Sequence, residues 1–182
     1  MDLVDLIAEK RFLGQEFLTW LWYKSDERGG TVFLPSAGTD IRLVFEKHML
    51  LEYGEGEALE KVICRGLQTE LKEARTGLAM GKKLEQSRVQ MIQDDHEWHM
   101  TLKGSLLEFR NVKPPKTMTG SEESDDPEAR EGMLLDRIGL LETAVRTVDE
   151  LFRMFLDVRI GPDWENELVK IRAWVDKAGI GI

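Results

Sequence analysis

The fold class is decided by the stretch Arg88-Val-Gln-Met-Ile-Gln-Asp-Asp-His-Glu-Trp-His-Met-Thr-Leu-Lys103. Apolar and polar residues alternate through both of its halves, which is the period of a strand with one buried face. Asp94-Asp95, between the halves, suits a turn. The alternating apolar residues are Val89, Met91, Trp98, Met100 and Leu102. The stretch therefore predicts an antiparallel hairpin.

The residues before this hairpin predict further strands. Thr31–Leu34 is a short apolar run, and Leu59–Arg65 is a longer one. Ile41–Phe45 and Met49–Tyr53 both alternate with period two. Glu46-Lys47-His48 lies between these two runs, and we interpret it as the turn of a second hairpin.

Two helices are predicted around these strands. Leu13, Phe17, Trp20 and Leu21 recur at helical spacing, and Gly29-Gly30 ends that segment. The aromatic residues from Phe17 to Tyr23 belong either to the core or to a base-stacking surface. The second helix is predicted over Thr69–Lys83, with Thr69 as its N-cap.

The C-terminal part is predicted to be helical. The polar, acidic residues 117–130 are interpreted as a flexible linker. A long helix is predicted from Glu131 to about Ile160, and a last helix over Asp163–Lys177. The long helix carries an apolar seam of alternating four- and three-residue spacing, which fits either dimerisation or packing on the chain's own domain. The seam residues are Leu134, Ile138, Leu141, Val145, Val148, Phe152 and Phe155.

Together these elements predict an α+β fold, with an antiparallel sheet, packed helices and a C-terminal helical hairpin. We expect residues 1–116 to form the α+β domain, residues 117–130 the linker and residues 131–182 the helical hairpin. The N-terminus lacks the pattern of a signal peptide, so we expect a cytoplasmic protein with no membrane segment. Cys64 is the only cysteine, so no internal disulfide can form.

No combination of residues points to catalysis or to a cofactor. His96 and His99 are three apart in a predicted strand and would face opposite sides, which does not suit a metal site. The pairs Asp94-Asp95 and Asp125-Asp126 could bind Mg²⁺ in a hydrolase, but both lie in turn or linker sequence. We expect no cofactor, no metal and no small-molecule substrate, and we interpret Cys64 as a small buried residue.

Charge suggests a binding surface instead. The net charge is −9, yet residues 61–116 carry 11 basic and 7 acidic groups, a net of +4. On one edge of the helix predicted over 69–83, four cations would form a stripe: Lys72, Arg75, Lys82 and Lys83. Arg65 and Arg88 would lie near this stripe. Such a stripe fits either a phosphate-binding surface or a solvated helix edge.

Several segments resemble one known family. They are Arg11-Phe-Leu-Gly-Gln-Glu-Phe-Leu-Thr-Trp-Leu-Trp-Tyr23, Glu73-Ala-Arg-x-x-Leu-x-x-Gly-Lys-Lys83, Trp98-x-x-x-Leu102 and Leu107-x-Phe-x-x-Val-Lys-x-Pro-Lys116. In these segments and in the terminal helix the chain resembles the later part of the recombination-associated protein RdgC family. Members of that family are usually longer, near 300 residues.

The resemblance implies an α+β protein that binds DNA without sequence preference. Family members form a dimeric ring around duplex DNA and limit the loading of the recombinase RecA. We therefore expect a homodimer that binds duplex or single-stranded DNA in the cytoplasm, at the nucleoid, with the six basic residues as contacts. The alternative is a non-enzymatic interaction or dimerisation module that uses the apolar seam. Clustering of the cations on one face would favour DNA.

Overall fold

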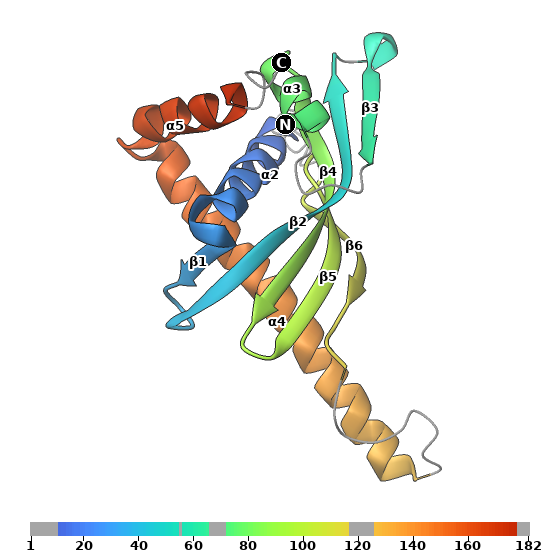
Figure 1. Ribbon diagram of the computed structural model, residues 1–182. Helices are drawn as coiled ribbons and strands as arrows, with labels where there is room; N and C mark the ends of the chain where they lie inside the picture. Colours follow the sequence, from blue (N-terminus) through green and yellow to red (C-terminus); the bar gives the residue numbers. More distant parts are fainter. Residues whose placement is uncertain (1–10, 55, 66–71, 117–125, 178–182) are drawn as a thin grey trace, which may run out of the picture.

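The computed structural model describes residues 11–54, 56–65, 72–116 and 126–177 (Figure 1). Within them the sheet has six strands, all paired antiparallel, in the order β1-β2-β4-β5-β6, with β3 also paired to β2. The strands are β1 Thr31–Leu34, β2 Thr39–Tyr53, β3 Glu60–Arg65, β4 Lys83–Gln93, β5 His96–Lys103 and β6 Glu108–Lys113. The helices are α2 Arg11–Asp26, α3 Lys72–Ala79, α4 Pro127–Ile160 and α5 Trp164–Asp176, with short 3-10 turns η1 Glu27–Gly30 and η2 Gly56–Ala58. The predicted α+β class is confirmed.

The hairpin predicted from the alternating stretch is formed by β4 and β5. Gln93 pairs with His96, so Asp94 and Asp95 make a two-residue turn. Asp94 has a φ of 51°, as the tight turns that join twisted strands require. Trp98 is buried, as are the other four alternating apolar residues, Val89, Met91, Met100 and Leu102.

The second predicted hairpin is wrong, because Thr39–Tyr53 is one continuous strand. Between the pairs Phe45↔Val89 and Met49↔Ser87, β2 carries two more residues than β4, which marks a bulge. Residues 46–48 are therefore an irregularity inside a long strand. β1 pairs with the first half of β2 and β3 with its second half, both on the edge opposite β4.

One face of the sheet carries the core. Its buried residues alternate along β2, β4 and β5, and they pack against α2, whose Phe17, Trp20 and Leu21 are almost fully buried. Of the two alternatives for the aromatic residues of this helix, packing in the core is confirmed. The helix α3 packs on this face too, since a Cβ on Gly77 would lie 3.0 Å from Leu51 Cδ2. No described helix covers the other face, called the open face below.

The helix α3 is shorter than predicted. It ends at Ala79, and Gly81 follows with a φ of 86°. The amide of Lys82 donates to the carbonyl of Gly77 at 2.9 Å, which is the closing bond of a glycine-terminated helix. Lys82 and Lys83 therefore lie beyond the helix, and Lys83 begins β4. The predicted cap Thr69 lies outside the described residues.

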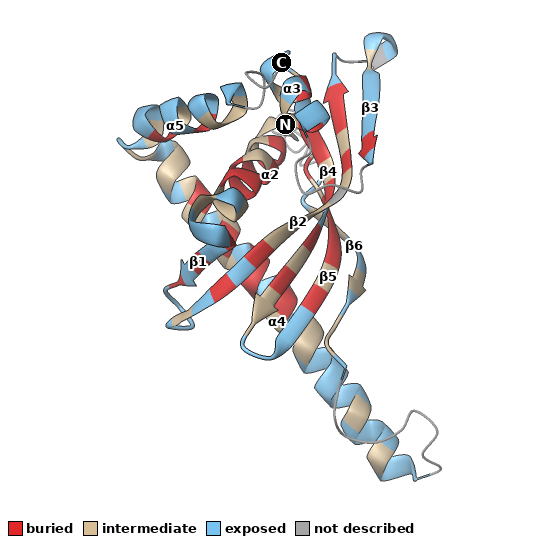
Figure 2. Cartoon of the chain, in the orientation of Figure 1, coloured by how far each residue is buried: buried red, intermediate tan, exposed pale blue. Residues whose placement is uncertain are grey.

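The long helix α4 begins one turn earlier than predicted. Asp126 caps it by accepting from the amide of Glu128 at 3.1 Å, so residues 127–130 are helix and not linker. Residues 117–125 of the predicted linker lie outside the described part of the chain. The C-terminal half of α4 runs across the core side of the sheet, and its N-terminal half extends beyond the sheet (Figures 1 and 2). The helix α5 follows a short turn at Gly161 and contacts α3, α4 and α2.

The predicted seam of α4 divides into two parts. Val148 and Phe155 are buried in the core, and Phe152 is half-buried. By contrast, Leu134, Ile138 and Val145 are 59, 50 and 50 % exposed. The residues that α4 buries beside Val148 and Phe155 are Ala144, Thr147 and Leu151, which lie off the predicted seam. The core-facing side of α4 is therefore rotated from the seam.

Candidate nucleic-acid interface

The basic stripe predicted for one helix edge does not form, and Arg75 is the clearest case. Its guanidinium donates to Asp26 and lies 4.6 Å from the ring centre of Trp174 and 5.8 Å from that of Trp22. Cation–π contacts of this kind stabilise a fold when they are partly desolvated. Arg75 thus joins α3 to α2 and α5, and it is not available to a ligand.

The other members of the stripe are separated. Lys82 lies 3.3 Å from a carboxylate oxygen of Glu60 and 5.6 Å from the ring centre of Tyr53, with a side chain only 17 % exposed. Lys72 and Lys83 are exposed, but one is on α3 and the other on β4. Of the four predicted cations, two therefore hold the fold together.

The open face of the sheet brings together the two remaining predicted cations, Arg65 and Arg88. Arg65 of β3 pairs in register with His48 of β2, and Arg88 of β4 lies opposite the bulge that contains His48. Both arginines are exposed, and neither has an ion-pair partner among the described residues. The pKa of His48 is lowered by partial burial and by the positive charges of Arg65 and Arg88. The sequence did not single out His48, because its place between the two arginines depends on strand order.

The same face becomes acidic one step further along the strands. His99 of β5 has Glu46 Oε1 at 2.8 Å from its Nδ1 and Glu97 Oε1 at 2.6 Å from its Nε2. The hydrogen bond to Glu46 raises the pKa of His99, partial burial opposes this, and Glu97 adds to the rise. The open face thus has a cationic part around Arg65 and Arg88 and an anionic part around His99.

These two environments predict a measurable split between the histidines. We expect the pKa of His48 below the ordinary value of about 6.5 and that of His99 above it. The contacts of His99 therefore stabilise the fold at pH values below about 6.5, and this stabilisation is lost as the pH rises through the raised pKa. The positive charges of Arg65 and Arg88 have the opposite effect on His48, because its protonation beside them destabilises the fold as the pH falls. An NMR titration of the imidazole protons checks the split, with Glu46→Gln as the variant that lowers the pKa of His99 and leaves His48 below 6.5. Coinciding titrations would contradict the division of the face.

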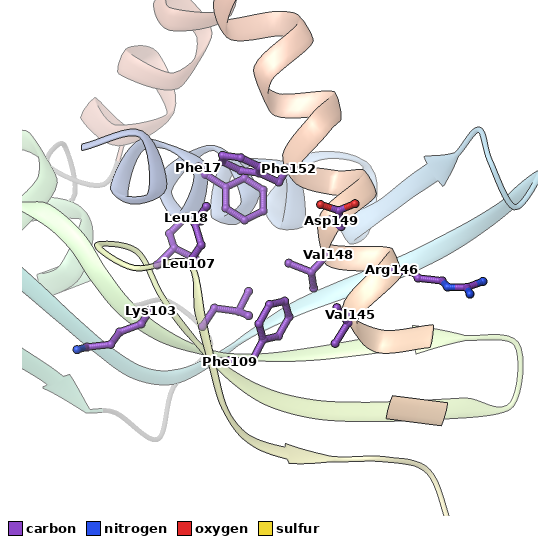
Figure 3. Close-up of a pocket in the computed structure, with 11 residues that line it drawn as sticks. Phe17, Leu18, Lys103, Leu107, Phe109, Val145, Arg146, Val148, Asp149 and Phe152 are labelled. Atoms are coloured by element: carbon purple, nitrogen blue, oxygen red, sulfur yellow. The ribbon is translucent and has the colours of Figure 1, made fainter. Parts of the chain in front are cut away.

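A second feature is an apolar cavity of about 270 Å³ on the core side of the sheet (Figure 3). It lies between α2, the second half of α4 and the turn that leads from β5 to β6. Apolar side chains dominate its lining: Phe17, Leu18, Leu107, Phe109, Val148 and Phe152. Lys103, Arg146 and Asp149 also border it. Because apolar side chains make up most of its lining, the cavity would suit an apolar group.

Among the described residues, the acidic side chains of the predicted carboxylate pairs do not converge with the histidines, and Asp125 lies outside the described part of the chain. Asp94 and Asp95 are exposed in the β4–β5 turn, and Asp126 caps α4. Over the described residues, no group of His, Cys, Asp and Glu side chains is arranged to hold a metal ion. Cys64 is 2 % exposed, which confirms it as a buried residue, and burial followed by the charge of Glu73 raises the pKa of its thiol.

Comparisons of the chain with protein-family models, with curated proteins and with solved structures found no match. The likeness to the RdgC family therefore stays an expectation. Among the described helices, none is both long and apolar enough to cross a bilayer.

Proposed function

We propose that this chain binds DNA without sequence preference and without catalysis, through the cationic part of the open face. The observation that carries the proposal is the position of Arg65 and Arg88. They come from strands on either side of β2, they are exposed, and no described acidic residue pairs with them. The acidic residue near His48 is Glu46, and its carboxylate is hydrogen-bonded to His99.

The spacing of the two arginines suits a phosphate backbone. Strands β3 and β4 are two strand spacings apart, or about 10 Å. One strand of B-DNA presents a phosphate every 3.4 Å or so of helix axis. Each guanidinium can therefore meet a different phosphate, and its fork of N–H donors suits phosphate oxygens. Contacts of this kind position a duplex and carry no sequence information.

The resemblance to the RdgC family supports the same function and suggests a link to recombination. With a net charge of −9, attraction to DNA must come from a local surface. Binding should accordingly be weak at physiological salt and strong only at low salt. Phosphate binding next to His48 would also raise the lowered pKa of this histidine, so protonation would strengthen binding below neutral pH.

The test is duplex binding, followed by fluorescence anisotropy of a labelled oligonucleotide over a range of salt concentrations. We expect Arg65→Ala/Arg88→Ala to weaken binding by about 10- to 100-fold at low salt. Two lost phosphate contacts should also reduce the slope of log K against log salt by about two. The unfolding temperature should change little, because both side chains are exposed.

The matched control is Arg172→Ala/Lys177→Ala, which removes the same charge from exposed positions of α5 and its C-cap. It should retain the native slope. Equal loss in the two double variants would mean that only net charge matters. No binding by the native chain at low salt would reject the proposal.

A further inference from the structure

A second surface, independent of the open face, is an apolar strip on α4. At 100° per residue, Leu134, Ile138, Leu141 and Val145 lie on one side of the helix, about a quarter turn from the side that faces the core. No residue of α4 before Ala144 is buried. Leu140 is joined to the sheet, because its carbonyl accepts from Trp98 Nε1 at 2.9 Å. Figure 2 shows the exposed half of α4 standing clear of the sheet.

The strip leads directly into the apolar cavity. Val145, Val148 and Phe152 continue the same side of α4, and they line the cavity together with Leu107 and residues of α2 (Figure 3). Leu107 is 41 % exposed and has a φ of 49°, which a leucine rarely adopts. The turn thus holds an apolar side chain at the rim of the cavity at some cost in backbone strain. The strip and the cavity form one continuous surface.

We infer that this surface binds a second copy of the chain, with the two α4 helices antiparallel and Leu134 of each copy in the cavity of the other. The strip is self-complementary about Leu141. Leu134 and Val148 lie seven residues on either side of it, so an antiparallel pair centred on Leu141 places Leu134 opposite Val148, at the cavity. The same surface then serves both copies, as a two-fold interface requires.

The position of the cavity along α4 selects the antiparallel arrangement. The core of each copy packs on the second half of α4, next to the strip. In a parallel pair, Leu134 would lie opposite Leu134 of the other copy, far along the helix from both cavities. An antiparallel pair places the globular parts at opposite ends, and each exposed helix end then lies along the other copy. The first half of α4 buries no residue in its own core, so contact with the second copy would also stabilise it.

Cysteine crosslinking tests the arrangement in the full-length chain. Leu141→Cys lies at the two-fold axis and should form an intermolecular disulfide on mild oxidation. Leu134→Cys should not crosslink with itself, since its two copies would be about 21 Å apart along the helices, far beyond disulfide reach. The native chain is the control, because its single cysteine is buried. Efficient crosslinking of Leu134→Cys would indicate a parallel pair and overturn the proposal.

Sedimentation equilibrium tests whether the pair forms at all. The native chain should be a concentration-dependent dimer, and Leu134→Asp/Ile138→Asp should raise its dissociation constant at least tenfold. Both side chains are at least half exposed, so these variants should fold. Thr143→Asp, on the opposite side of α4, should dimerise like the native chain. A native chain that stays monomeric at high concentration, or a dimer that the double variant leaves intact, would overturn the proposal.

Discussion

Gly14→Ala should destabilise the protein by about 3 kcal/mol, although alanine is the better helix former. Gly14 lies in α2, where the helix meets the turn after β5. A Cβ at this position would lie 1.9 Å from the carbonyl oxygen of Gly104 and 2.8 Å from its carbonyl carbon. Both atoms belong to the backbone, so α2 and the turn would have to move apart. Urea unfolding of the native chain and the variant measures the loss.

The shift would also disturb the buried Glu85. Its carboxylate accepts from Gln15 Nε2 at 2.8 Å and from the amide of Ser105 at 3.3 Å, and so it joins α2 to the same turn. The matched control is Gly139→Ala, in an exposed part of α4 where a Cβ would meet nothing within 4 Å. That variant should gain about 0.5–1 kcal/mol from helix propensity. Equal effects of the two substitutions would contradict the close approach at Gly14.

The alternation of apolar and polar residues predicts most strands of the sheet, but it does not predict where the backbone forms a bulge. Period two predicted the β4–β5 hairpin well, because one face of both strands is buried. At residues 46–48 the polar triplet suggested a turn, yet Phe45 and Met49 are both odd-numbered and keep the same face. An unbroken period across the triplet was the signal for one strand. The bulge itself depends on register with β4, which no local pattern contains.

The candidate site shows the same limit. The end of α3 could have been predicted, because glycine is the usual residue just after a helix, and Gly81 stands before Lys82. The role of Arg75 could not, since it depends on Trp22 and Trp174, which are far apart in the sequence. Arg65 and Arg88 become neighbours of one histidine only through the strand order β3-β2-β4. For α4, the seven-residue repeat marked an apolar strip but not which part of it the core would cover.

Phe155→Ala should cost about 3–5 kcal/mol of unfolding free energy. The ring is fully buried, and its centre lies 5.7 Å from that of Phe17 and 5.8 Å from that of Trp20. Removing it leaves a cavity where α4 meets α2. Val169→Ala, at a 64 % exposed position of α5, is the control and should change stability by less than about 0.5 kcal/mol.

The way in which Phe155→Ala unfolds also tests the domain division at residue 116. The core cluster runs without a break from Phe17 in α2 to Ile171 in α5. If sheet and C-terminal helices form one cooperative unit, fluorescence and far-UV circular dichroism should report a single coincident transition at lower urea. Two separate transitions, with the helices melting first, would show that residues 11–116 hold their fold alone. The C-terminal helices would then be an appendage docked on a finished domain, and their loss should leave the cationic part of the open face able to bind DNA.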